Sequence, residues 1–382
     1  MSNGKHSWSH LVTMALSALI ILSVTAFVAE SALLPGVEYG YRIINLGTLG
    51  GDSSAAADMN NYSQIVGWST TDSGARHAFL YHDGMMTDLG TLQGGVNSQA
   101  VAINDRVQIV GTSEINALGA GFPEILQGFI WEHGDIQSLG ALYCPCSYNV
   151  RYGSSTARGI NNSSQVAGWS ETVRGTWVLH ALLWQSNVLQ DLGGGAGDWS
   201  ISRVFDINDN GQLVGDYAQD AGMLTTYDRH ASLWQNDARQ DLGMLPGYES
   251  STALAINNRN QVVGWAGAFD GRASRAFRWE NGYMQDLGTL PGDTNSAAQA
   301  INIFGQAVGW SGNVKQVDSH AVLWNHNRIL DLNRLLPANS GWVLTEATAI
   351  NTLGQIAGIG LYNGQMRAFL LQPGYKHSFP SK

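Results

Sequence analysis

The pattern of apolar and polar positions repeats along most of the chain, and each repeat contains short strand-like segments. In "AINNRNQVVGW", residues 255–265, a polar turn-forming run separates two apolar segments, with Asn, Gln and Gly at spacings of four and three. Short apolar or alternating runs bounded by turn residues are typical of strands. The same frame occurs seven times, with Asn60, Asn104, Asn161, Asn208, Asn257, Asn302 and Asn351 followed by Gly67, Gly111, Gly168, Gly215, Gly264, Gly309 and Gly358.

Two further motifs follow each copy in the same order. One reads "HAFLY" at residues 77–81 and "HALLW" at 180–184, and the other reads "MTDLGTL" at 86–92. Each unit therefore predicts four strands, and the repeated Asn recurs every 44 to 57 residues. Four strands per unit at this period predict an all-β fold, a β-propeller of seven four-stranded antiparallel blades.

The two ends of the repeat region complement each other. The segment "YRIINLGTL", residues 41–49, resembles a fourth strand without its first three, and the seventh copy stops after its third strand. We therefore expect the N-terminal strand to complete the last blade and close the ring. The predicted propeller covers residues 41–374, followed by a C-terminal tail at 375–382.

The repeated Asn and Gly have structural interpretations. An Asn amide bonds backbone groups two residues on and tolerates left-handed dihedrals, which suits a turn between the first and second strands; a ring of seven Asn ligands is the alternative. Gly inside a strand is unfavourable by about 0.5–1 kcal/mol relative to Ala. We therefore expect a neighbouring sheet or a large aromatic ring to approach each repeated Gly closely.

Histidine and tryptophan also recur at fixed positions. Because Gln and Arg replace His in three copies, the position favours a structural hydrogen-bond donor on a flat group over catalysis. The residues at this position are His77, Gln127, His180, His230, Arg275, His320 and Arg367. Nine of the 13 tryptophans follow the repeated Gly or close the third strand, so we interpret them first as packing residues.

Composition limits the partners. The net charge is −10, with 20 Lys+Arg against 30 Asp+Glu, which argues against a nucleic-acid partner. An apolar run at Leu11–Val28 follows Lys5 and precedes small residues, the layout of a signal peptide over residues 1–31 with cleavage near Ser31; an uncleaved anchor is the alternative. We expect a monomer that is secreted, periplasmic or on the cell surface, without other membrane contact.

The two cysteines do not form a disulfide framework. Cys144 and Cys146 stand in "YCPCSY", where a bridge across one residue would be strained, so they predict a local loop clip or two thiols. Two sulfurs alone make a poor zinc site. We expect no metal and no cofactor.

The three motifs together resemble the bacterial HAF-repeat family, described as probable extracellular repeats and named for its His-Ala-Phe. The resemblance covers about residues 41–373, with departures at Gly128, at Arg275 and Arg367, and at Asn333 in "DLNRL". It implies secretion and a repeat architecture, and it implies no defined reaction.

A ligand site is expected where the connections vary. The turns after the first and third strands are uniformly short, whereas the other connections vary in length and should emerge together on the opposite face, where binding sites usually lie. Trp residues outside the repeat positions and nearby polar residues suit sugar or peptide stacking there; plugs that anchor the loops are the alternative. The candidate ligand-binding residues are Trp177, Trp199, Trp342, Asp198, Arg151, Tyr152, Tyr227, Asp228 and Tyr248.

These observations lead to two predicted functions. The first is a secreted or cell-surface propeller that binds a glycan or protein ligand through its variable face. The second is an extracellular polysaccharide lyase or glycosidase on the same scaffold, because fold does not fix function. No Gly-x-Ser-x-Gly, His-Glu-x-x-His or phosphate-binding loop motif occurs, so no catalytic residue is assigned and a non-enzymatic role is favoured.

Overall fold

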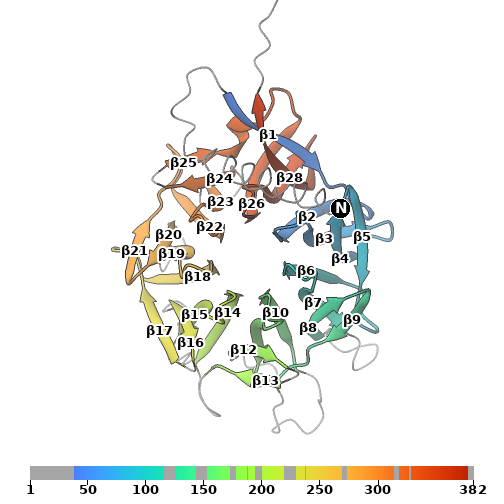
Figure 1. The fold of residues 1–382 in the computed structure, drawn as a ribbon, viewed down its shortest axis with the longest axis vertical. Helices are drawn as coiled ribbons and strands as arrows, with labels where there is room; N and C mark the ends of the chain where they lie inside the picture. Colours follow the sequence, from blue (N-terminus) through green and yellow to red (C-terminus); the bar gives the residue numbers. More distant parts are fainter. Residues whose placement is uncertain are drawn as a thin grey trace, which may run out of the picture.

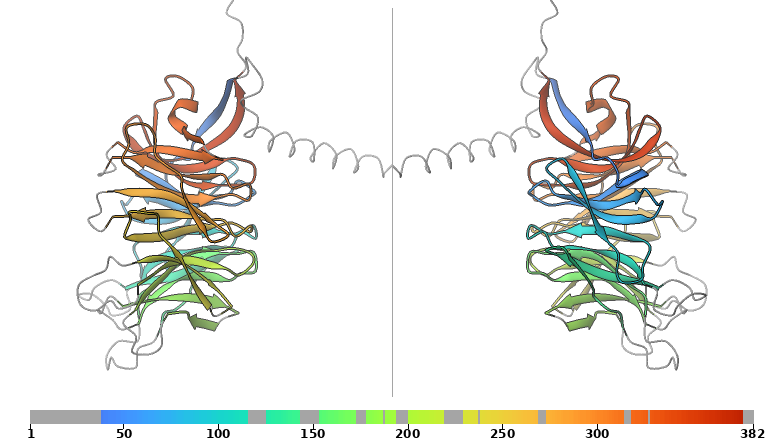
Figure 2. Two further views of the ribbon diagram at one scale, coloured as in Figure 1. Left: turned by 90° about the vertical axis from the view of Figure 1, so that its left-hand side faces the viewer. Right: turned by 90° about the vertical axis from the view of Figure 1, so that its right-hand side faces the viewer.

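The fold is a closed ring of seven four-stranded antiparallel sheets, as predicted (Figure 1). It is seen in a computed structural model that describes residues 38–115, 125–142, 153–172, 178–186, 188–193, 200–218, 229–236, 238–268, 273–313, 318–326 and 328–376. Viewed from the side, the ring is a disc with the blades lying edge-on (Figure 2). The predicted signal segment and both cysteines lie outside the described residues. We call the strands of each blade A to D, from the centre outwards.

The A and B strands form the inner half of every blade. The A strands are β2 (Gly50–Met59), β6 (Ser98–Ile103), β10 (Ser155–Ile160), β14 (Ile201–Ile207), β18 (Ser250–Ile256), β22 (Asn295–Ile301) and β26 (Trp342–Ile350). The B strands are β3 (Ile65–Thr71), β7 (Ile109–Ile115), β11 (Val166–Glu171), β15 (Leu213–Ala218), β19 (Val262–Gly267), β23 (Ala307–Gly312) and β27 (Ile356–Tyr362).

The C and D strands form the outer half. The C strands are β4 (Arg76–His82), β8 (Ile125–Glu132), β12 (Leu179–Gln185), β16 (His230–Gln235), β20 (Ser274–Glu280), β24 (His320–Asn325) and β28 (Gln365–Lys376). The D strands are β5 (Met85–Gly90), β9 (Asp135–Ser138), β13 (Val188–Asp191), β17 (Ala238–Gly243), β21 (Tyr283–Asp286), β25 (Arg328–Asp331) and, for the seventh blade, β1 (Glu38–Asn45).

The ring closes through the N-terminal strand, which confirms the prediction from the chain ends. β1 pairs with β28 in antiparallel register from Glu38↔Lys376 to Asn45↔Phe369. In Figure 1 the blue β1 accordingly lies beside the red β28. An apolar core cluster that contains Met59 and Phe79 of the first blade and Leu370 of the seventh seals the same junction.

The hydrophobic core is divided among the junctions between blades. Seven buried clusters occur among the described residues, and each combines side chains from two neighbouring blades. Phe129 and Phe277, both from C strands, are fully buried in two of them. Because each sheet buries its faces against the next blade, the ring is stabilised as a whole.

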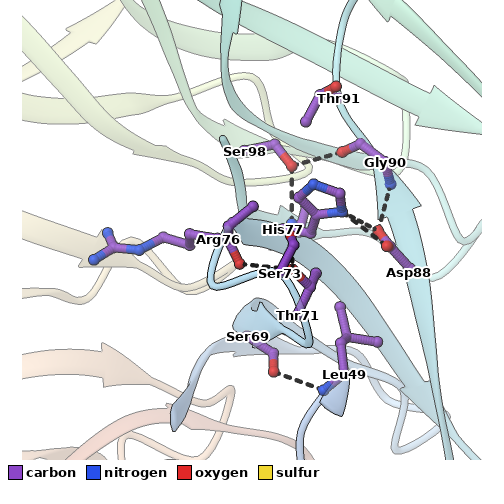
Figure 3. Close-up of polar contacts among 12 residues, drawn as sticks. Leu49, Ser69, Thr71, Ser73, Arg76, His77, Asp88, Gly90, Thr91 and Ser98 are labelled. Atoms are coloured by element: carbon purple, nitrogen blue, oxygen red, sulfur yellow. Dashed lines mark hydrogen bonds and ion pairs between the residues drawn. The ribbon is translucent and has the colours of Figure 1, made fainter. Parts of the chain in front are cut away.

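Serine side chains reinforce these junctions. At six of them a Ser of strand A donates to or accepts from the backbone of the preceding blade. Ser98, for example, donates to Gly90 O at 2.6 Å and accepts from Ala78 N at 2.9 Å (Figure 3). At the remaining junction Asn333, in the 3-10 turn η1 (Leu332–Leu335), exchanges hydrogen bonds with the backbone of Leu344 instead. This explains the departure "DLN" from the repeated "DLG".

The closest approach at the repeated Gly comes from the backbone of the paired A strand, which corrects our expectation of a neighbouring sheet, and a Phe ring approaches as well only at Gly111 and Gly358 among the seven. A Cβ added to Gly264 would lie 2.0 Å from the carbonyl O of Thr252 in the paired A strand. Across the seven positions the equivalent distance is 1.8–2.2 Å. The cause is a β-bulge in every A strand, where the register shifts, as between Ala253 and Ala255.

Candidate functional site

The two faces of the disc differ in their connections. Every A–B connection has five residues, from 60–64 in the first blade to 351–355 in the seventh, and these turns together with the C–D turns form what we call the turn face. The B–C and D–A connections emerge on the opposite side, which we call the loop face. Among the B–C connections, two residues join β27 to β28, whereas nine separate β7 from β8.

The repeated Asn side chains form a closed ring around the turn-face end of the central channel. Asn257 Oδ1 accepts from Arg259 N at 2.9 Å and from Gln261 N at 3.1 Å, which confirms its predicted role in the turn. Its Nδ2 donates to Gln261 Oε1 at 2.8 Å and to the carbonyl O of Asn302 in the next blade at 2.9 Å.

All seven blades repeat this arrangement. The bonds from each Asn Nδ2 to the next Asn carbonyl measure 2.9–3.4 Å, and the last runs from Asn351 back to Asn60. The seven Asn residues are only 3–6% exposed. Because their amide groups are occupied by the protein itself, the alternative of seven Asn ligands has no support, and the ring links the blades.

A small cavity lies beside this ring. It has a volume of about 330 Å³ and is lined by the Asn ring, the Ile or Met before each Asn, and the residue after it. The residues after Asn also bond between blades: Asn61 N donates to Asp105 Oδ1 at 3.0 Å, and Asp105 N donates to Asn162 Oδ1 at 2.9 Å. The turn face therefore uses its polar groups for cohesion.

The repeated histidines face the repeated aspartates of strand D. His77 Nδ1 lies 2.8 Å from Asp88, which also accepts from Gly90 N at 2.7 Å (Figure 3). His180 and His230 face Asp191 and Asp241 at 2.9 and 2.7 Å. The serine near His77, Ser98 from strand A of the second blade, is held by two backbone bonds, so no Ser–His–Asp relay forms there.

The second blade corrects our interpretation that the repeated His position always holds a hydrogen-bond donor. Gln127 accepts a hydrogen bond from Ser138 at 2.6 Å, and Ser138 replaces the usual Asp. Arg367 donates to the carbonyl O of Asp52. The position therefore requires a partner matched to its own blade, which remains a structural role.

The sequence-predicted ligand residues are mostly not described. Outside the described residues are Arg151, Tyr152, Trp177, Asp198, Trp199, Tyr227 and Asp228. Trp342 begins β26 at the loop face and packs on Tyr362 and Phe369, with ring centroids 5.1 and 6.1 Å apart. Tyr248 lies in a D–A connection of the loop face, half-buried against the core between the fourth and fifth blades.

A second cavity occupies the central channel on the loop-face side of the Asn ring. Its volume is about 370 Å³, and its walls come from the A strands, with Trp68 and Ile359 from B strands. One residue of each A strand, three before the repeated Asn, contributes to the wall. These seven residues are Ala57, Val101, Arg158, Phe205, Leu254, Gln299 and Thr348. Arg158 is therefore the one charged member of this ring.

Arg158 belongs to a cluster of three arginines from the third and fourth blades, with Arg203 in β14 and Arg229 just before β16. Arg203 donates from Nε to Asp216 Oδ1 at 2.9 Å and pairs through a second nitrogen with the other oxygen of that fully buried carboxylate. Thr252 Oγ1 also donates to Asp216 at 3.2 Å. Burial and the charge of Arg203 lower the pKa of Arg158 to about 10 and also lower that of Arg229.

Two buried carboxyl groups, those of Asp58 and Asp206, also line the channel cavity, and that of Glu346 lies beside its wall residue Gln299. Burial raises the pKa of Asp58, and it raises the pKa of Asp206 to about 7 with smaller contributions from Asp58 and Asp209. Each accepts two backbone N–H groups, Asp206 from Ile207 at 2.8 Å and from Ile256 of the next blade at 2.9 Å. Burial likewise raises the pKa of Glu346, which accepts from Gln299 Nε2 at 2.8 Å.

Our sequence analysis missed the arginine cluster. The recurring tryptophans, Trp169 among them, were interpreted there as packing residues, and no role was assigned to Asp216. The signal was available as departures from the repeat: Asp216 stands where four copies have Trp, and Arg158 stands where the other copies have no charge. Only the ring geometry shows that these departures, from different blades, lie together.

The described part of the chain offers neither a membrane-spanning helix nor a cluster of metal ligands. Within the described ranges, no helix is long and apolar enough to cross a membrane. Among the same residues, no group of three or more His, Cys, Asp or Glu side chains is arranged to hold a metal ion.

The architecture defines the chain as a seven-bladed β-propeller. Comparisons with known proteins support this fold and nothing more specific. No known family description and no curated protein sequence matches it. Among solved structures, a prolyl endopeptidase shares the fold at 9% identity and a TM-score of 0.51, over 100% of this chain and 57% of that one.

Two further peptidases are similar. An acylaminoacyl peptidase of Pyrococcus horikoshii matches at 8% identity and TM-score 0.48, covering 85% of this chain and 52% of that one. A puromycin-hydrolyzing peptidase of Mycobacterium tuberculosis matches at 11% identity and TM-score 0.48, covering 89% and 54%. This chain thus spans little more than half the length of these proteins.

Proposed function

We propose that this protein is a binding propeller that holds a glycan or protein ligand on its loop face. The proposal includes secretion or display at the cell surface, which rests on the sequence of residues 1–31, and kinship with HAF-repeat proteins, which rests on the three motifs. A rigid scaffold that displays variable connections on one side is a common arrangement for recognition.

The observation that supports this proposal is the contrast between the two ends of the channel. At the turn face the repeated polar side chains bond to one another around the ring. Toward the loop face, Arg158 Nε and Arg229 Nε are buried without a hydrogen-bond partner among the described residues. Buried unpaired donors are unfavourable, and a ligand that accepts from them would relieve that penalty.

A second candidate is an extracellular carbohydrate-active enzyme. It is favoured by Glu346 and Asp206, because buried carboxyls with raised pKa values can serve as general acids near neutral pH. Against it, Asp206 is occupied by two backbone N–H groups. The binding function is therefore the stronger candidate.

The proposal is tested by screening the full chain on glycan arrays and against a library of secreted proteins. Tyr248→Ala, on the loop face, should weaken binding of any ligand found, whereas Tyr62→Ala, at a 66% exposed position in an A–B turn, should leave it unchanged. Urea unfolding of both variants checks that they remain folded. If Tyr62→Ala alone weakens binding, the ligand lies on the turn face and the proposal is contradicted.

Turnover is measured on the same glycans. Polysaccharides that bind are incubated with the protein and assayed for new reducing ends and for absorbance of unsaturated products. Binding without products supports the proposed function. Products formed with repeated turnover would show an enzyme, and the absence of any ligand would contradict the binding function itself.

A further inference from the structure

Arg158 lies on the wall of the central cavity and forms no ion pair with a carboxylate among the described residues. The other six members of its ring are uncharged, and no carboxylate contributes to its pKa. Its Nε is buried without a partner among the described residues. A guanidinium carries five N–H donors in a planar fork that matches the two oxygens of a carboxylate.

The surrounding charges do not neutralise it. The positive charge of Arg203 lowers the pKa of both Arg158 and Arg229, and among the described residues Asp216 is the carboxylate that pairs with Arg203 and acts on Arg229. Asp216 already accepts from Arg203 through both oxygens and from Thr252. In a chain of net charge −10, three neighbouring arginines with one paired carboxylate among the described residues are unexpected next to a cavity.

Aromatic rings hold the arginines beside the cavity. The Trp169 and Phe205 rings meet edge to face at 5.3 Å, and the guanidinium carbon of Arg158 lies 5.7 and 5.6 Å from their centroids. Phe205 and Trp68 also line the cavity, together with Gln99 and Gln299. Apolar faces next to amide groups suit a sugar ring with hydroxyls. The volume of about 370 Å³ is at the lower end of the usual range for small-ligand sites, about 300–1,000 Å³.

We propose that the loop-face cavity binds an acidic saccharide, a uronate residue of an anionic glycan, with its carboxylate paired to Arg158. The cavity accommodates one sugar unit, and the remaining chain leaves through the loop face. This inference rests on the proposed binding function and names the class of its ligand.

The carboxylates in the cavity do not oppose this assignment. Asp58 and Asp206 lie one residue closer to the turn face than the Arg158 ring, and each directs its oxygens to backbone N–H groups. Because burial raises the pKa of Asp206 to about 7, that group is partly protonated at neutral pH. Glu346 belongs to the seventh blade, across the ring from the third blade, and bonds to Gln299 (Figure 1).

The experiment compares an acid with its own ester. Binding of di- and trigalacturonate and of their methyl esters to the full chain is measured by calorimetry, with an acidic hexapeptide as a third probe. We expect the acids to bind and the esters to bind at least tenfold more weakly, because esterification removes the charge and keeps the sugar. Arg158→Gln should lower the affinity for the acid at least tenfold.

Arg278→Gln is the matched control. Arg278 is also a half-buried strand arginine, but it bonds to Gln285 near the turn face, so its loss should leave binding unchanged. Urea unfolding shows whether each variant is folded. If Arg158→Gln does not fold, the difference in affinity between acid and ester, measured on the unaltered protein, still tests whether the ligand's charge is recognised.

The outcomes separate this inference from the proposed function. Equal binding of acid and ester, or an Arg158→Gln variant that binds like the original, would overturn the inference and leave a loop-face binding protein for neutral glycans or proteins. Binding of the peptide but not of the galacturonates would replace the saccharide by an acidic protein segment. Absence of any ligand in the arrays would remove the proposed function as well.

Discussion

Replacing a repeated Gly of strand B is the most direct test of how the blades are built. In Gly264→Ala the new Cβ would lie 2.0 Å from Thr252 O and 3.0 Å from Ala253 Cα. Neither atom is the end of a side chain that could rotate away, because both belong to the bulged A strand. The clash can be relieved only by moving that strand, which also carries Asn257 of the ring.

The expected magnitude follows from this geometry. Overpacking inside a well-packed core typically destabilises by about 1–3 kcal/mol, and a clash with backbone should reach the upper end. We therefore expect Gly264→Ala to lower the free energy of unfolding by about 3 kcal/mol. Urea unfolding followed by tryptophan fluorescence measures it, with circular dichroism as a second probe because a ring of this size need not unfold in two states.

Gly374→Ala provides the matched control. Gly374 also lies in a strand, β28, but the nearest atom to an added Cβ is Gly40 O at 4.0 Å, which is ordinary contact. This variant should stay within about 0.5 kcal/mol of the original protein. The reasoning is refuted if Gly264→Ala is equally harmless, or if both variants lose stability to the same extent.

Three further predictions concern the Asn ring, the loop face and the channel. Asn257→Asp keeps the two hydrogen bonds that the side chain accepts, but it places a carboxylate oxygen against Gln261 Oε1 and Asn302 O. Urea unfolding at pH 7 should therefore show that the free energy of unfolding falls by about 2 kcal/mol. Asn281→Asp, in an exposed turn, is the control and should leave it almost unchanged. Trp342→Ala should lower the free energy of unfolding by about 3 kcal/mol, because packing on Tyr362 and Phe369 is lost. If the variant instead keeps its stability and loses ligand binding, the indole of Trp342 contacts the ligand. The folded-state pKa of Asp206, about 7, lies above its unfolded value, so its protonated form stabilises the fold below about pH 4 and this contribution is lost as the pH rises to 7. Relative to Asp206→Asn, the original protein should therefore lose a few kcal/mol between these pH values, and parallel stability–pH curves would contradict the assignment.

The sequence was sufficient for the fold because each blade repeats the same local signals. The turn at Asn257, the four strands and the fragment at 41–49 all depend on nearby residues, which a single chain displays. The donation from Asn257 Nδ2 to Asn302 could not be foreseen, because it depends on how far one blade stands from the next. The same holds for Gly264, where a bulge in the paired strand replaces the expected neighbouring ring.

The site was only partly accessible from the sequence. Trp342 and Tyr248 were chosen because they stood outside the repeat, and both rings pack against the core. Arg158 stood inside the repeat and was passed over, although its charge set it apart from six sibling residues. Residues that are the same in every copy mainly report on the fold. The residues that are informative about the site are those that differ from the other copies at positions facing the channel.

The pairing of β1 with β28 has a consequence for the order of assembly. These strands come from opposite ends of the described chain, so their contact carries the largest loop-closure entropy in the molecule and cannot form during synthesis until the seventh repeat has emerged. Once β28 has formed and before β1 pairs with it, its outer edge is an open template, and the β1 segment of a second copy matches it as well as its own. Crowded nascent chains can therefore exchange this strand, so a dimer linked through β1 is the misassembly to look for when the protein is produced at high concentration.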